Sequence, residues 1–219
     1  MKDAMNLIAA QAYSTRARGI FLLISLVLTG CALPGQPVRP AIYDFGPGAR
    51  SAASASQARL APLAVADVEA NPALDSTAVL YRLAYADDQQ LKAYAQARWS
   101  MPPAQLVRQR LRERLGQHRA LLNPGEGGLP GAPAPLTLRI ELEEFSQLFE
   151  APDKSVGLLR LRATVVRPGS GGETLVAQRS VTVQRPAISA DAPGGVRAMT
   201  AATDAAVGEL DQWLQGLMP

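Results

Sequence analysis

Cys31 is the only cysteine of the chain, and its position indicates chemistry more clearly than that of any other residue. It comes directly after Leu-Thr-Gly at 28–30, at the end of an apolar run over 20–28 that Arg16 and Arg18 precede. A bilayer-spanning helix needs about 20 apolar residues, so this run is too short to be one. The order of charged, apolar and small residues is instead typical of a secretion signal. The Cys31 thiol is therefore the candidate for covalent modification.

The four residues 28–31 resemble the lipobox of bacterial lipoproteins, in which small residues fit the signal peptidase and the cysteine is acylated before cleavage. The resemblance implies a signal peptide over 1–30, a lipidated Cys31 carrying fatty acyl chains such as palmitate, and a flexible Pro/Gly-rich tether over 31–40. Ala32 follows the cysteine, where lipoproteins retained in the inner membrane usually carry Asp. We therefore expect a lipid anchor in the outer membrane of a Gram-negative bacterium, with the body facing the periplasm.

The other reactive residue types do not form a convincing catalytic or metal site. His118 is the only histidine, and its place at the apolar stripe of a predicted helix favours a semi-buried histidine without a chemical role. Glu141, Glu143 and Glu144 could suggest acid/base catalysis, but Arg160 and Arg162 lie on the neighbouring predicted strand, so an ion ladder is the better interpretation. We expect no enzyme activity, no cofactor and no metal.

Net charge and chain length limit the possible functions and the number of domains. Removal of residues 1–30 takes away Lys2, Arg16, Arg18 and Asp3, which lowers the formal net charge from +3 to +1. The sequence pI of about 9.3 is therefore poor support for nucleic-acid binding. Residues 41–219 have the usual length of a single domain. With Cys31 acylated, this domain has no cysteine left for a disulfide, so packing must stabilise it.

The periodicity predicts an α+β fold. Alternation of apolar and polar residues predicts half-buried strands, with a meander in the second half of the domain. A helix after Pro102 and Pro103, with an apolar stripe reaching Leu122, and a last helix over about 196–217 each have one apolar face. We expect a largely antiparallel mixed sheet with two main helices packed on one face. The arginines that flank the first helix are expected to cover apolar edges while their charges stay in water. The predicted strands lie at 42–45, 60–68, 77–85, 91–98, 136–143, 159–165 and 175–183.

The central block of the sequence resembles a known family. Its signature is Tyr-Arg at 81–82, Tyr94, Trp99 and Pro-Pro at 102–103, with Tyr-Asp-Phe at 43–45 near the start of the domain. The block is similar to periplasmic auxiliary lipoproteins of ABC-type lipid transport systems, such as the lipoprotein of the paraquat-inducible Pqi system and those encoded with MCE-type transporters. Trp99 also has a plain structural explanation, as an aromatic side chain filling the corner between a strand and a helix.

The resemblance implies a non-enzymatic protein that helps to move lipid between the inner and outer membranes. Its partners would be an MCE-type tunnel protein and the ABC permease and ATPase of the same system. In this interpretation Tyr81, Arg82, Tyr94, Trp99, Pro102 and Pro103 have structural or docking roles. The residues do not decide between a monomer and a homo-oligomer.

Two other functions remain open at this point. The domain could carry lipid itself in an internal apolar cavity. It could also be an accessory lipoprotein for outer-membrane assembly or lipopolysaccharide export. The identity of the partner separates the last alternative from the transport component.

Overall fold

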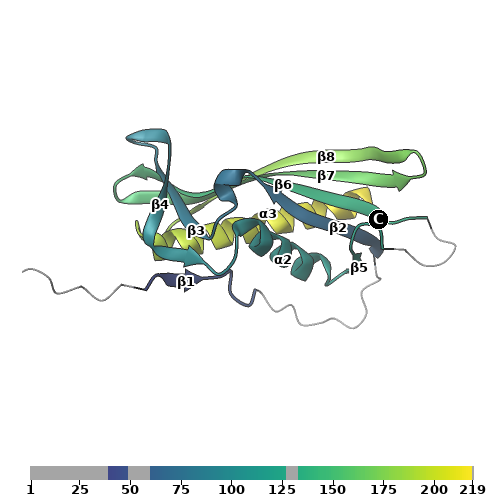
Figure 1. The fold of residues 1–219 in the computed structure, drawn as a ribbon, viewed down its shortest axis with the longest axis horizontal. Coiled ribbons are helices and arrows are strands. Elements are labelled where there is room, and N and C mark those ends of the chain that lie inside the picture. The colour runs from purple at the N-terminus through teal and green to yellow at the C-terminus, as the bar shows by residue number, and fades with distance from the viewer. Residues whose placement is uncertain (1–38, 49–59, 127–132, 219) are drawn as a thin grey trace, which may run out of the picture. The chain divides into compact units, whose positions relative to one another are not determined.

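A computed structural model describes residues 39–48, 60–126 and 133–218, which belong to one compact unit (Figure 1). Within these residues the chain forms eight strands, one short 3-10 helix and two α-helices. The elements are β1 (Ala41–Tyr43), β2 (Leu60–Ala70), η1 (Pro72–Leu74), β3 (Ala78–Leu83), β4 (Asp87–Trp99), α2 (Pro103–Leu115), β5 (Arg119–Leu122), β6 (Leu136–Ala151), β7 (Lys154–Gly169), β8 (Gly172–Pro186) and α3 (Ala192–Leu217).

The predicted meander is confirmed. Strands β6, β7 and β8 follow one another in antiparallel ladders and are longer than the sequence pattern suggested. Their apolar residues alternate with polar ones, and the apolar face is buried at positions such as Leu159, Leu161 and Val181. The long ladders of the sheet are thus antiparallel, as expected for the α+β fold.

The other edge of β6 makes the sheet mixed. The first half of β6 pairs in parallel with β2, and its last residues pair in parallel with β3. From there β2 pairs in parallel with β5, while β3 pairs with β4 in antiparallel and β4 with β1 in parallel. One edge of the long strand β6 therefore pairs with two shorter strands, β2 and β3, and each of them extends the sheet.

A β-bulge in β6 explains why the sequence alternation breaks between Leu142 and Phe145. Leu142 pairs with Leu161 and Glu144 with Arg160, so Glu143 is an extra residue in the strand. Because of this extra residue, Leu142 and Phe145 are both buried although they are three positions apart. In a regular strand, the side chains of Leu142 and Phe145 would lie on opposite faces of the sheet.

Helix α2 is shorter than predicted. The sequence stripe suggested a helix that reaches Leu122, but α2 ends at Leu115, and residues 119–122 form β5 instead. Leu121 and Leu122 fit a helical stripe, but they also fit a strand, and pairing with Leu63 and Ala64 of β2 decides the outcome. The Gly116 amide closes the last turn on the carbonyl oxygen of Arg112.

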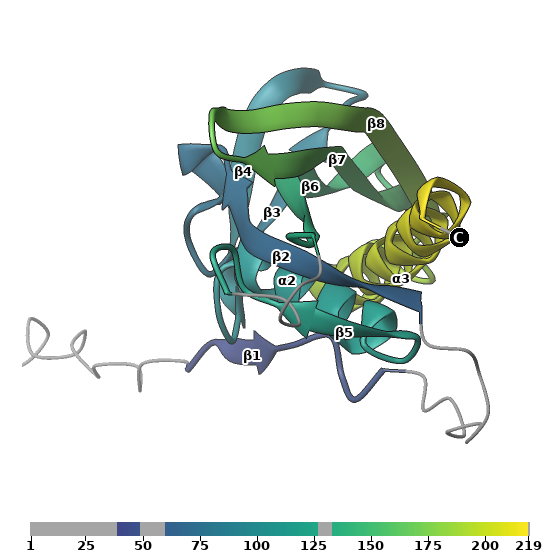
Figure 2. The same ribbon diagram turned by 90° about the vertical axis from the view of Figure 1, so that its right-hand side faces the viewer.

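Helix α3 starts at Ala192, four residues before the predicted start. Asp191 caps it by accepting a hydrogen bond from the Gly194 amide, and proline occupies its first turn. The helix packs against β6, β7 and β8, whereas α2 packs against β2 and α3 (Figure 2). Gly157 of β7 permits the close approach, since a Cβ there would overlap with the backbone of Ala198 and Met199.

Candidate functional site

The predicted lipidation site, Cys31, lies outside the described residues. The described chain begins at Arg39, two residues before β1. The structure therefore places the residues of the central sequence block, but not the anchor. These block residues lie on β3, on β4 and at the start of α2, and they take part in three side-chain clusters.

Trp99 fills the corner between β4 and α2. It is the last residue of β4 and is fully buried, with its ring edge-on to Phe45 at 5.5 Å and 5.6 Å from the ring of Phe145. Pro102 and Pro103 follow after two residues, at the start of α2, where the missing amide hydrogens cost little. The burial of Trp99 at this corner agrees with its structural explanation.

Arg110 connects this corner to the start of the domain. Its guanidinium donates to the carbonyl oxygens of Phe45 and Gly46 and pairs with Asp204 of α3 at 3.3 Å. Burial raises the pKa of Asp204, although the charge of Arg110 acts in the opposite direction. Phe45, two residues after β1, is therefore linked through Arg110 to both α2 and α3.

The burial of Arg110 corrects one sequence expectation. The arginines of the first helix were expected to lie on its flanks with their charges in water, but Arg110 and Arg119 are buried. Arg119 lies in β5, and burial lowers its pKa while the nearby Asp211 acts to raise it. For Arg110 the expectation fails because its partners, Phe45, Gly46 and Asp204, come from distant segments that periodicity does not reveal.

His118 and Asp211 form a second polar connection between α2 and α3. His118 lies in the turn after α2 rather than on a helix stripe, with Nε2 4.0 Å from the buried Asp211 carboxylate. Arg114 pairs with the same carboxylate at 3.0 Å, and Gln215 donates to it. An acid surrounded by fixed donors has a structural role here, and sequence reasoning had not selected Asp211.

Tyr81 and Tyr94 meet on the face of the sheet that α3 covers. Their ring centroids are 4.6 Å apart, and the Tyr94 hydroxyl donates to Oε1 of the buried Gln147 at 2.8 Å. Gln147 in turn donates to the Ser155 hydroxyl. Burial is the main reason that the pKa of Tyr94 is raised. This chain of hydrogen bonds satisfies the polar groups beneath the first turn of α3, where a Cβ at position 195 would overlap with the Gln147 side chain.

Arg82 occupies the opposite face of β3. Its guanidinium makes two hydrogen bonds to the two carboxylate oxygens of Glu144, and Ser146 donates to the same carboxylate. Arg82 also donates to the backbone carbonyls of Asp88 and Gln89 at the start of β4. The bidentate pair therefore joins β3, β4 and β6 at one point. All six block residues have a structural explanation.

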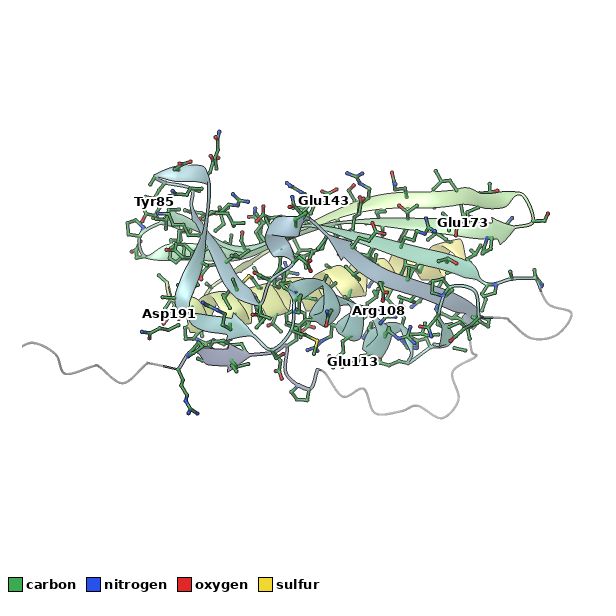
Figure 3. The ribbon with its side chains drawn as sticks, viewed as in Figure 1. Tyr85, Arg108, Glu113, Glu143, Glu173 and Asp191 are labelled. Atoms are coloured by element: carbon green, nitrogen blue, oxygen red, sulfur yellow. The ribbon has the colours of Figure 1, made fainter. Side chains whose placement is uncertain are left out.

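The predicted ion ladder on β6 and β7 is present. Glu143, which is labelled in Figure 3, pairs with Arg160 at 3.0 Å and with Arg162 at 2.6 Å. Arg162 also approaches Glu141. Each of these carboxylates has a cationic neighbour across the strands, which is the arrangement of a solvated sheet face rather than of an acid/base pair. In the described part of the chain, no group of three or more potential metal ligands occurs.

Two grooves adjoin the helices. One of about 690 Å³ runs beside α2 and contains Arg108, Arg112, Asp67 and Glu113. Another of about 510 Å³ separates the segment 42–46 from α3. Among the residues that the structure places, no helix is both long and apolar enough to cross a membrane. The described body thus has two open grooves beside its helices and polar connections between its elements.

Comparisons with known proteins support the assignment of the central block. Residues 43–210 match a family described as ABC-type transport auxiliary lipoprotein component. A crystal structure of a Xanthomonas campestris protein of the family DUF330 superposes with a TM-score of 0.65 at 20% identity, covering 81% of this chain and 96% of that one. The crystal structure of an uncharacterized protein superposes with a TM-score of 0.59 at 13% identity, covering 80% and 99%. The search of curated protein sequences gave no match.

Proposed function

The chain belongs to the family of ABC-type transport auxiliary lipoprotein components, and from this premise we propose that it is a non-enzymatic docking component of a lipid transport system. The system would link the inner and outer membranes. The observation that carries the proposal is the family match over residues 43–210, which includes the three block clusters, α2 and most of α3.

The anchor in this proposal is Cys31, and its membrane is the outer one. Acyl chains contribute about 0.8 kcal/mol for each buried CH₂, so several chains on one residue hold a protein firmly at a bilayer. Ala32 instead of Asp after the cysteine favours the outer membrane. The Arg110 contacts with Phe45 support this arrangement, because they fix the first segment of the body behind the tether.

The proposed partner is an MCE-type tunnel protein served by an ABC permease and ATPase. In this arrangement, the described body would bind the end of the MCE tunnel at the outer membrane. The packed core favours docking over lipid carriage, since the face of β6 and β7 toward α3 is filled by fully buried side chains such as Leu142, Leu161 and Met199. Such a core has no room for an acyl chain unless the helix moves.

Lipid transfer in cells tests the proposal. Radiolabelled phospholipid is followed from the inner to the outer membrane in cells that lack the protein and in cells that regain it. We expect the transfer to slow without the protein and to recover with the native chain. Cys31→Ala should fail to restore it, because the body is released from the membrane. Equal transfer with and without the protein would contradict the proposal.

The anchor itself is tested by membrane fractionation. Cys31→Ala should leave the outer-membrane fraction, whereas Thr29→Ser is a matched control that keeps a small residue before the cysteine. Ala32→Asp should move the protein to the inner membrane without releasing it. A Cys31→Ala chain that stays in the outer membrane would refute lipid anchoring.

A further inference from the structure

The groove between the segment 42–46 and α3 has an unusual combination of side chains. Its walls are largely apolar, and Ile42 at its rim is 70% exposed. A partner seated in the groove would bury this side chain together with the apolar walls. The segment 42–46 forms one wall of the groove, and residues of α3 that include Arg197 and Asp204 form the other.

Two exposed arginines lie in this region. Arg197 lines the groove, and Arg39 lies three residues before Ile42 in the chain. The charge of Arg197 also acts on Asp191, whose pKa it helps to lower. Of the two acids that line the groove, Asp204 pairs with Arg110, whereas Asp44 is exposed and accepts a hydrogen bond from the Gly46 amide. An anionic surface that approaches β1 would meet the exposed guanidinium groups of Arg39 and Arg197 and the exposed side chain of Ile42.

The covalent chain keeps this region close to the proposed anchor. Seven residues separate Cys31 from Arg39, so even a fully extended tether spans about 28 Å between them. In both ribbon views, β1 lies at the bottom of the body and β8 at the top (Figures 1 and 2). The side that carries β1 is therefore the one that the tether brings nearest to the membrane.

We propose that Arg39, Ile42 and Arg197, named here the β1 surface, contact the phospholipid headgroups of the membrane that holds the anchor. Ile42 would insert among the headgroups, and the two arginines would meet lipid phosphates. The inference rests on the proposed lipidation of Cys31. It adds an orientation to that proposal: β8 and the ion ladder face away from the membrane, toward the periplasm, where a protein partner approaches.

Depth-dependent quenching tests this contact in the lipidated full-length mature protein. The protein is reconstituted into vesicles of phosphatidylethanolamine and phosphatidylglycerol that contain brominated acyl chains. Because the chain has a single cysteine and it is acylated, Ile42→Cys provides one reactive thiol for an environment-sensitive fluorophore. Leu175→Cys is the matched control, since Leu175 is 61% exposed but lies on β8. We expect several-fold stronger quenching at position 42 than at position 175.

Charge reversal tests the role of the arginines. In the labelled Ile42→Cys protein, Arg39→Glu combined with Arg197→Glu should reduce the quenching at least twofold. The control pair Arg167→Glu and Arg185→Glu changes the net charge equally on exposed positions of β7 and β8 and should leave the quenching unchanged. An equal loss with both pairs would overturn the assignment to the β1 surface.

The outcomes separate this inference from the proposed function. A protein that attaches to vesicles but shows equal quenching at positions 42 and 175 retains its anchor and overturns only the β1 surface. A protein that stays in the supernatant overturns the lipidation of Cys31 and the inference with it. Attachment with quenching confined to position 42 supports both.

Discussion

The guanidinium of Arg110 donates a hydrogen bond to the carbonyl oxygen of Phe45, a residue 65 positions earlier in the chain. Arg110 belongs to α2, whereas Phe45 follows β1 by two positions. The same guanidinium pairs with Asp204 of α3. One buried side chain thus holds three segments together at the point where the tether enters the body.

Replacing Arg110 by leucine should destabilise the protein by about 3 kcal/mol, because two carbonyl oxygens and a carboxylate lose their cationic partner. Urea unfolding measures the change. Arg160→Ala is the matched control on the exposed ladder, and its cost should stay below about 1 kcal/mol. Equal losses for the two variants would contradict the role assigned to Arg110.

Asp204 should make stability depend on pH. Its folded-state pKa is raised, chiefly by burial, so the folded protein holds this proton more tightly than the unfolded chain. The free energy of unfolding should therefore fall as pH rises from about 4 through the raised pKa. Asp204→Asn should show a smaller fall over the same range. Unfolding curves between pH 4 and 7 test this, and identical slopes in both proteins would refute it.

Tyr94→Phe removes the donor to Gln147 while it keeps the ring contact with Tyr81. The buried amide oxygen loses a partner, so we expect a cost of about 1–2 kcal/mol. The raised pKa of Tyr94 also means that stability falls as pH rises above about 10, because the unfolded chain ionises there first. Chemical unfolding at pH 8 and 10.5 measures both effects. A Tyr94→Phe variant with the native pH dependence would exclude Tyr94 as its source.

Two glycines should respond in opposite directions to alanine. A Cβ at Gly157 would overlap with the backbone of α3, so Gly157→Ala should cost about 3 kcal/mol or more. Gly208 lies in α3, and a methyl group there would have no atom of another element within 4 Å, so Gly208→Ala should stabilise by about 0.5–1 kcal/mol. Thermal unfolding distinguishes them. A Gly157→Ala protein as stable as the native one would show that α3 does not pack closely on β7.

Much of the fold was predictable because local pattern and burial agree. The alternation in β7 and the stripe of α3 follow directly from which residues face the core. The end of α2 was not predictable in the same way, because Leu122 suits a helix and a strand equally and only β2 decides between them. The parallel branches on β6 also depend on contacts between distant segments.

The same difference between local and distant contacts separates the site residues that could be predicted from those that could not. Trp99 before Pro102 and Pro103 was readable as a strand-to-helix corner because neighbouring residues make that corner. The pairing of the buried charges could not be predicted, because Arg110 and Asp204 are far apart in sequence and each has the pattern of a solvated helix position. Gln147 was not selected from the sequence, because a single glutamine in an apolar strand does not indicate a role. Its role becomes clear only when the fold places Tyr94 beside it.

The central claim is that this chain docks a lipid transport system at the outer membrane, and partner identification tests it most directly. The native, affinity-tagged protein is chemically crosslinked in intact cells and purified from membranes, and the crosslinked peptides are sequenced. The account predicts crosslinks between the described body and an MCE-type protein, which are lost in Cys31→Ala. Crosslinks only to outer-membrane assembly or lipopolysaccharide-export proteins would contradict it.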